Sequence, residues 1–164
     1  PIRKGKLKTP TEIGRTLRVD QNEEGYSTGC QVFVGNPGDA CQPQLAVERH
    51  IEVFGEPPKQ LAGDRGMGCP TNDRKLTKLG VEDICLPRPG PLTQARKAVE
   101  QEPTFWELKK WRAGIEALIS VMKRVLGWDR CLFAGTSGAE AWTDWSVLTY
   151  NLRRYGRAKA AQAA

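Results

Sequence analysis

The sequence predicts an α/β fold, and two observations support this prediction. Strand-like runs alternate with helix-like runs through the middle of the chain, which is typical of a sheet covered by helices. The chain has 164 residues with a hydrophobic fraction of 39%, enough to form one ordinary core. Internal repeats and Gly/Ser-rich linkers are absent from the sequence, so we expect a single domain.

The N-terminal part predicts a β-hairpin. Residues 12–20 alternate apolar and polar side chains, as a half-buried strand does, and residues 26–34 form a second such run. The sequence Asn-Glu-Glu-Gly at 22–25 is suited to the turn between them. Residues 1–10 are basic and bounded by prolines, and we interpret them as a basic arm or as a solvated, disordered chain end.

The middle of the chain predicts two helices and two short strands. Apolar spacing over 43–54 indicates a helix that stops at Gly55. A buried strand is expected at 59–64 and another at 81–86. Between them, Thr71 or Asn72 can cap a helix that ends at Gly80. A polar stretch without predicted structure then continues to residue 102.

The C-terminal part predicts two helices. The first covers 103–127, with an apolar stripe made by Trp111, Ile115, Leu118, Met122 and Val125. A strand remnant is expected at 132–133 and a second helix at 138–155, followed by a disordered tail at 158–164. Trp111, Trp142 and Trp145 lie on apolar helical faces and are expected in the core.

Composition limits the possible functions. No apolar run approaches the roughly 20 residues of a membrane span, and we expect a cytoplasmic protein. The net charge of +6 is compatible with a polyanionic partner but is weak evidence for one. Five cysteines without paired spacing predict reduced thiols, and a single histidine leaves oxygen ligands for any metal, which favours Mg²⁺ or Mn²⁺. A P-loop motif and a dinucleotide fingerprint are both absent from the sequence.

Two carboxylates are candidate site residues. Asp64 ends the strand predicted at 59–64 and stands in Gly-Asp-Arg-Gly, and ligands of α/β sheets gather at the carboxyl ends of strands. Glu116 shares one line of its helix with Arg112 and Lys123. By itself, each carboxylate also has an ordinary explanation, as a turn residue for Asp64 and as a surface helix residue for Glu116.

Together these motifs resemble the DDE transposases of bacterial insertion sequences. The shared order is a strand, Gly-Asp-Arg-Gly, a helix, a strand ending in Leu-Pro-Arg, and a helix with Arg-x3-Glu-x6-Lys. In that family the last motif begins with a tyrosine, and Lys109 stands at its position here. The resemblance implies an RNase H-like mixed sheet of about five strands flanked by helices. It also implies that 11–157 is the C-terminal part of such a catalytic domain, lacking its first strand.

The resemblance further implies the chemistry of DNA transposition. Asp64 would be the second acid and Glu116 the third acid of a triad. The first acid has no counterpart in the chain, since Asp20 lies where the family has no catalytic residue, so we predict that this chain alone is inactive or nearly so. Asp64 and Glu116 would hold two Mg²⁺ or Mn²⁺ ions for cleavage and strand transfer.

The implied partner is double-stranded DNA, the insertion-sequence ends and the target, bound by a homodimer in the bacterial cytoplasm near the nucleoid. Arg112 and Lys123 would neutralise phosphates at the cut. Further backbone contacts are expected from a group of four cations: Arg65, Arg88, Lys109 and Arg124.

Two other functions remain open from the sequence. The first is a basic DNA-binding or interaction domain without catalysis, which would bind DNA equally well after loss of Asp64 or in a chelator. The second is a structure-specific nuclease of the same fold, which cuts DNA without joining it. The resemblance favours the transposase.

Overall fold

The structure is a computed structural model that describes residues 2–3, 11–12 and 14–163. The chain divides into two compact units, one made of 1–37 with 119–164 and the other of 38–118. The sequence predicted one domain without this division. The physical reason is that the N-terminal hairpin packs on the C-terminal helix, so one unit is built from both ends of the chain.

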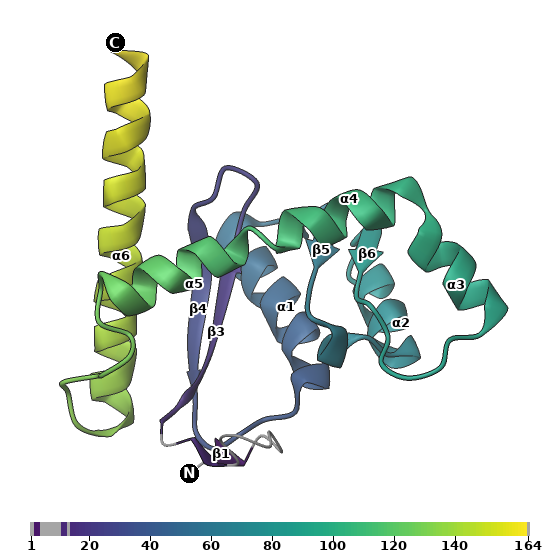
Figure 1. Cartoon of the computed structure of the whole chain (residues 1–164), viewed down its shortest axis with the longest axis horizontal. Coiled ribbons are helices and arrows are strands. Elements are labelled where there is room, and N and C mark those ends of the chain that lie inside the picture. Colours follow the sequence, from purple (N-terminus) through teal and green to yellow (C-terminus); the bar gives the residue numbers. More distant parts are fainter. Residues whose placement is uncertain (1, 4–10, 13, 164) are drawn as a thin grey trace. The chain divides into compact units, whose positions relative to one another are not determined.

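The first unit contains the predicted hairpin. Strands β3 (Thr16–Gln21) and β4 (Ser27–Phe33) pair antiparallel, which confirms the prediction (Figure 1). The turn has Gly25 at φ 79°, a left-handed conformation that favours glycine. The Asn22 side chain accepts a hydrogen bond from the Tyr26 amide at 2.8 Å. Two further short strands, β1 (Ile2–Arg3) and β2 (Thr11–Glu12), also pair antiparallel, and residues 4–10 of the predicted arm lie outside the described residues.

Helix α6 (Gly135–Gln162) packs on β4 through polar and small residues. The Asn151 side chain accepts from the Ser27 amide and donates to the Ser27 carbonyl, both at 2.9 Å. The helix is longer than predicted, and the expected disordered tail is wrong for 158–162. The reason is composition, because this alanine-rich segment has high helix propensity. Residues 132–133 form no strand, so the expected strand remnant is also wrong.

Two of the three tryptophans expected in the core are largely exposed. Trp145 is 66% exposed and Trp111 is 40% exposed, so the prediction is wrong for both. Trp142 is half-buried, and its indole N–H donates to the Gly127 carbonyl at 3.3 Å. Helical spacing of apolar residues therefore identified an apolar face without showing whether anything covers it.

The second unit is built around a parallel strand pair, β5 (Gln60–Ala62) and β6 (Asp83–Cys85). Helix α1 (Gln42–Phe54) confirms the predicted helix and ends at Gly55 with φ 83°. Helix α2 (Pro70–Lys78) is capped by the Cys69 sulfur, which accepts from the Asn72 amide, and not by Thr71 or Asn72 as predicted. Proline as the first helical residue moves the cap to the residue before it.

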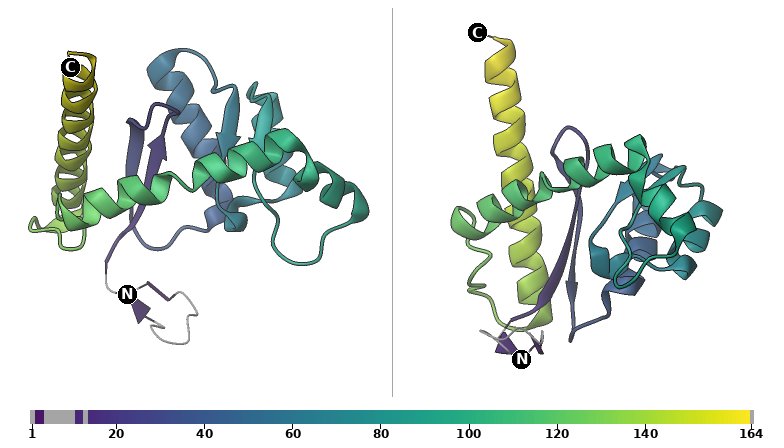
Figure 2. Two further views of the ribbon diagram at one scale, coloured as in Figure 1. Left: turned by 45° about the horizontal axis from the view of Figure 1, so that its top comes forward. Right: turned by 45° about the vertical axis from the view of Figure 1, so that its right-hand side comes forward.

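Helices cover both faces of the β5–β6 pair (Figure 2). On one face, Leu61 and Ile84 pack on a buried cluster from α1, α2 and the adjoining loops: Val47, Leu76, Val81 and Leu86. On the other face, Ala62 and Cys85 pack on Phe105 and Leu108. Because both faces are covered, the last two residues of each strand are apolar, as in buried parallel sheets.

Three helices occupy the segment where the sequence predicted one. Helix α3 (Gln94–Gln101) lies in the expected polar stretch, with Thr93 Oγ1 accepting from the Arg96 amide. The expected helix at 103–127 is instead α4 (Pro103–Arg112) and α5 (Ile115–Arg124), so the prediction of one helix is wrong. The break falls at Ala113–Gly114, where glycine disfavours a helix interior.

The α/β class is confirmed, whereas the single mixed sheet is not seen. The strands that the structure describes form three two-stranded sheets. Two short helical turns, η1 (Asp39–Cys41) and η2 (Arg65–Met67), also lie between the strands of the chain. No described helix is long and apolar enough to cross a membrane.

Candidate metal and phosphate site

Asp64 lies just beyond the carboxyl end of β5, as the sequence predicted. The Gly63 amide donates to the Cys85 carbonyl at 3.0 Å and so extends the pairing of β5 with β6 by one step. Asp64 then begins the turn η2, with its carbonyl accepting from the Met67 amide at 2.9 Å. The Asp64 side chain is 65% exposed, so its carboxylate is open to a ligand.

A close backbone contact holds the loop that carries Asp64. A Cβ atom added at Gly68 would lie 2.6 Å from the Leu86 carbonyl oxygen, closer than real Cβ atoms approach, and would also meet the Pro87 carbonyl. Only glycine therefore lets the end of η2 lie against the chain that leaves β6. This contact and the Gly63 hydrogen bond tie both ends of the Asp64 loop to the same strand.

Arg112, the last residue of α4, pairs with Asp64. Its Nη1 donates to Asp64 Oδ1, and the Arg112 side chain is 28% exposed. This ion pair joins two of the predicted site residues that are far apart in the sequence. It also places the end of α4 over the carboxyl end of β5.

Glu116 is exposed and lies in the first turn of α5. The Glu116 amide donates to the Ala113 carbonyl at 3.3 Å, and the Gly114 amide donates to the Trp111 carbonyl at 2.9 Å. The chain thus keeps turning through the break, and Glu116 follows Arg112 by about one turn, or roughly 6 Å along the axis. The structure brings Arg112 to Asp64. Glu116 lies four residues after Arg112, in the first turn of α5.

Oxygen is the available donor for a metal at this site. The one histidine, His50, packs its ring at a tilt against Phe54 on α1, with ring centroids 4.5 Å apart. Burial raises the pKa of the Cys85 thiol to about 11, so it stays protonated at neutral pH. Two carboxylates match the preference of Mg²⁺ and Mn²⁺ for oxygen. Within the described residues, however, no group of three or more His, Cys, Asp or Glu side chains could hold a metal ion.

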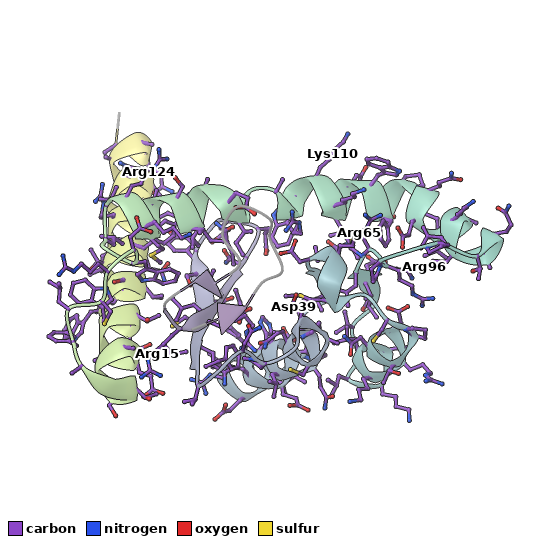
Figure 3. The ribbon with its side chains drawn as sticks, turned by 60° about the horizontal axis from the view of Figure 1, so that its bottom comes forward. Arg15, Asp39, Arg65, Arg96, Lys110 and Arg124 are labelled. Atoms are coloured by element: carbon purple, nitrogen blue, oxygen red, sulfur yellow. The ribbon has the colours of Figure 1, made fainter. Side chains whose placement is uncertain are left out.

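The remaining predicted cations of the second unit differ in their surroundings. Arg65 is exposed beside Asp64 in the sequence, and Figure 3 shows it on the side of α4 opposite to the one from which Lys110 points. Lys109 lies over the Trp106 ring, 4.7 Å from its centroid. This exposed Trp–Lys pair was not predicted, although its three-residue spacing on a helix was a usable signal.

Two predicted cations belong to the first unit. Lys123 lines a cavity of about 980 Å³ that also borders β3 and α6. Arg124 Nη2 contacts the Ser120 hydroxyl one turn earlier on α5. Glu116 and Lys123 are both on α5 but belong to different units.

Arg88, a predicted DNA contact, takes part in a charged network that the sequence did not reveal. Its Nη2 donates to Asp73 Oδ2 at 2.5 Å. Arg96 donates to the same oxygen at 3.2 Å and to Glu100 at 2.8 Å. Arg96 also donates to the Leu86 carbonyl at 2.8 Å, so the network supports the chain that faces Gly68. Arg88 thus takes part in the fold, and its contact with DNA stays a prediction.

Glu100 gives this network a dependence on pH. Burial alone would raise the pKa of Glu100, but hydrogen bonds from the Arg88 amide and the Arg96 guanidinium lower this pKa from its ordinary value. A carboxylate whose pKa is lowered by folding stabilises the fold at pH values above its pKa in the unfolded chain. This stabilisation is lost as the pH falls through the pKa of the folded state.

The substitution Glu100→Gln should therefore lower the free energy of unfolding at pH 7 by about 1–3 kcal/mol. The variant should also lose the part of the acid sensitivity that lies below about pH 4.5 in the wild type. Urea unfolding followed by circular dichroism at about pH 7 and about pH 3 measures both effects. Glu102→Gln, an exposed neighbour, is the control and should change neither.

Comparison with known families identifies the class of protein. The family model described as a transposase DDE domain matches residues 69–156, more than half of the chain. The chain therefore belongs to the DDE transposase domain family, whose members generally act on DNA with divalent metal ions in transposition. The match contains Arg112, Glu116 and Lys123, and Asp64 lies five residues before it. No curated protein and no solved structure matches the chain.

Proposed function

We propose that this chain takes part in metal-dependent cleavage and strand transfer at the DNA ends of a bacterial insertion sequence. The observation that carries the proposal is the Arg112–Asp64 ion pair, in a chain that belongs to the transposase DDE domain family. It joins the Gly-Asp-Arg-Gly loop to the Arg-x3-Glu motif. The β5–β6 pair with helices on both faces supports an RNase H-like arrangement.

In this proposal Asp64 and Glu116 hold the divalent ions. Bound Mg²⁺ or Mn²⁺ supplies an activated attacking oxygen and charge stabilisation of the leaving oxygen. Asp64 contributes an exposed carboxylate on a loop fixed to β6, and Glu116 contributes one from the start of α5. The rigid attachment of the Asp64 loop limits its movement, which is what positioning of a reacting phosphate requires.

Arg112 has two roles in the proposal. Without ions it neutralises Asp64, and its guanidinium can instead bind a phosphate through two parallel hydrogen bonds when DNA is present. Lys109 and Arg65 in the same unit add positive charge for the DNA backbone. Lys123 and Arg124 add positive charge from the first unit. We also propose that the chain binds DNA as a homodimer.

A second function has one observation in its favour. Because no group of three metal ligands exists among the described residues, a basic domain that binds DNA without cutting it also fits. Both functions predict that this chain alone cuts DNA poorly, the first because the described residues bring no third carboxylate to the site. Efficient cutting by this chain with Mg²⁺ would contradict the expected low activity and the non-catalytic function.

Binding of DNA with and without metal separates the two functions. We expect Mg²⁺ to tighten the binding of a fluorescent double-stranded oligonucleotide, measured by anisotropy at constant ionic strength. This gain should disappear in EDTA and in Asp64→Ala. Asp83→Ala, which removes a carboxylate from the neighbouring strand, is the matched control and should keep the gain. Equal binding in all four cases would support the non-catalytic function.

A further inference from the structure

The cavity of about 980 Å³ lies within the first unit, between β3, the last part of α5, the loop that follows and α6. Its volume is at the upper end of the range of small-molecule sites, about 300–1,000 Å³. Apolar side chains form much of its lining: Leu17, Val19, Ile119, Phe133, Ala139 and Trp142. In the proposed function only Lys123 belongs to this cavity, so its apolar interior has no role there.

Two aromatic rings, here named the aromatic wall, form one part of this lining. Phe133 and Trp142 meet edge to face, with ring centroids 5.5 Å apart and an angle of 84° between the rings. The Trp142 indole N–H donates to the Gly127 carbonyl at 3.3 Å, and a Cβ atom added at Gly127 would lie 3.0 Å from the same ring. Because these contacts hold Trp142 in place, its ring is a ready surface for a flat aromatic ligand.

The charges that line the cavity favour an anion. Three cations, here named the rim cations, are among the lining residues: Arg15, Lys123 and Arg130. Asp129 is the one acidic residue of the lining. Within the part of the chain that the structure describes, no ion pair neutralises any of the rim cations. All three are exposed, so they are free to bind a phosphate group at the solvent side of the cavity.

Trp128 supplies an unused hydrogen-bond donor to the same cavity. Its indole N–H is shielded from solvent and has no acceptor among the described residues, and the residue lines the cavity. A buried donor without a partner costs free energy, and most such groups in proteins do find a partner. A ligand with a lone pair beside this ring would satisfy the donor.

We propose that this cavity binds a nucleotide, with its base against the aromatic wall and its phosphate among the rim cations. A nucleotide combines a flat ring for stacking, acceptor atoms on the edge of the base for the Trp128 N–H, and a charged phosphate. This chemistry has two sources, a free nucleotide and a nucleotide of an unpaired DNA strand. The inference does not rest on the proposed function, because binding here requires neither Asp64 nor a divalent ion.

NMR of the ¹⁵N-labelled 164-residue chain tests the proposal through its five tryptophan indole signals. Titration with deoxyadenosine monophosphate (dAMP) in EDTA should shift the signals of Trp128 and Trp142, since both line the cavity. The signals of Trp106, Trp111 and Trp145, which are outside the lining, should stay in place. Replacing each tryptophan in turn with phenylalanine assigns the signals.

The two halves of dAMP test whether the aromatic wall and the rim cations act on one ligand. Deoxyadenosine carries the base without the phosphate, and inorganic phosphate carries the charge without the base. Each should bind about tenfold or more weakly than dAMP, because each loses one set of contacts. Equal binding of all three would overturn the proposal.

Substitutions separate the contributions of the lining residues to dAMP binding. Trp128→Phe keeps an aromatic ring but removes the donor, and should weaken binding about three- to tenfold. Arg130→Gln should weaken it about two- to fivefold, since an exposed cation is lost. Arg157→Gln removes an exposed cation of α6 outside the lining and is the matched control. Circular dichroism checks that every variant is folded.

A single-stranded oligonucleotide distinguishes the two sources of the nucleotide. If it shifts the Trp128 and Trp142 signals and binds more tightly than dAMP, the ligand is a nucleotide of an unpaired strand. Weaker or equal binding identifies a free nucleotide as the ligand. The proposal is wrong if these two signals stay in place with both probes, or if Arg157→Gln weakens binding as much as Arg130→Gln. Neither result would change the Mn²⁺ binding expected at Asp64, which is measured separately.

Discussion

Replacing Asp64 with asparagine is expected to weaken the binding of Mn²⁺ by about tenfold to a hundredfold or more. The amide keeps the shape of the side chain but removes the charge that attracts the ion. Glu116→Gln should have an effect of similar size if both carboxylates hold metal. Isothermal titration calorimetry with Mn²⁺ measures this directly and does not depend on whether the chain cuts DNA.

Replacing Arg112 should strengthen the binding of Mn²⁺, whereas replacing Asp64 weakens it. Its guanidinium pairs with Asp64 Oδ1, so an incoming ion must displace it. Because the pair is largely exposed, it contributes at most about 1 kcal/mol, and Arg112→Gln should tighten Mn²⁺ binding about two- to fivefold. The same substitution should weaken DNA binding, since a phosphate contact is lost.

Two carboxylate variants serve as controls for the predictions on Mn²⁺ binding. Asp83→Asn changes a carboxylate on β6 that accepts from Gln60 at 2.8 Å, and Glu107→Gln changes an exposed carboxylate on α4. Both should leave Mn²⁺ binding unchanged. If all four carboxylate variants lose binding equally, the ion is held by overall charge and the proposed site is wrong.

The second large effect is expected from Gly68→Ala. The new methyl group would lie 2.6 Å from the Leu86 carbonyl oxygen, in contact with backbone that cannot rotate away. Either the η2 loop or the chain after β6 must shift, and overpacking of this kind costs about 1–3 kcal/mol. We expect a lower free energy of unfolding in urea, together with weaker Mn²⁺ binding, because the loop carries Asp64.

Gly38→Ala is the matched control for this prediction. Gly38 belongs to the same unit, its φ of −62° suits any residue, and a Cβ atom there meets nothing within 4 Å. Its free energy of unfolding should stay within about 0.5 kcal/mol of the wild type. Unchanged stability of Gly68→Ala would show that the contact between the two loops is loose.

The sequence predicted correctly the features that depend on neighbouring residues. The β3–β4 hairpin followed from alternation and a glycine turn, and α1 from apolar spacing that ends at Gly55. The place of Asp64 followed from a short apolar strand bounded by glycine. The two motifs of the candidate site could therefore be identified in the sequence, but only separately. Each of them also had an ordinary explanation.

Tertiary structure decided the features that depend on distant residues. Helix α3 is polar and was missed, because its stabilising contacts run from Arg96 to Asp73 and to the Leu86 carbonyl. The Arg112–Asp64 pair joins residues 48 positions apart, which periodicity along one helix cannot reveal.

Helix α6 shows the same difference between what the sequence determines and what the tertiary structure determines. By itself the sequence determined that Trp145, Leu148 and Leu152 share a face, since helical geometry is local. Only the tertiary structure decided that the opposite face packs on β4 and leaves these three residues exposed. The physical reason is that burial depends on which segment arrives from elsewhere in the chain, here a hairpin more than a hundred residues earlier.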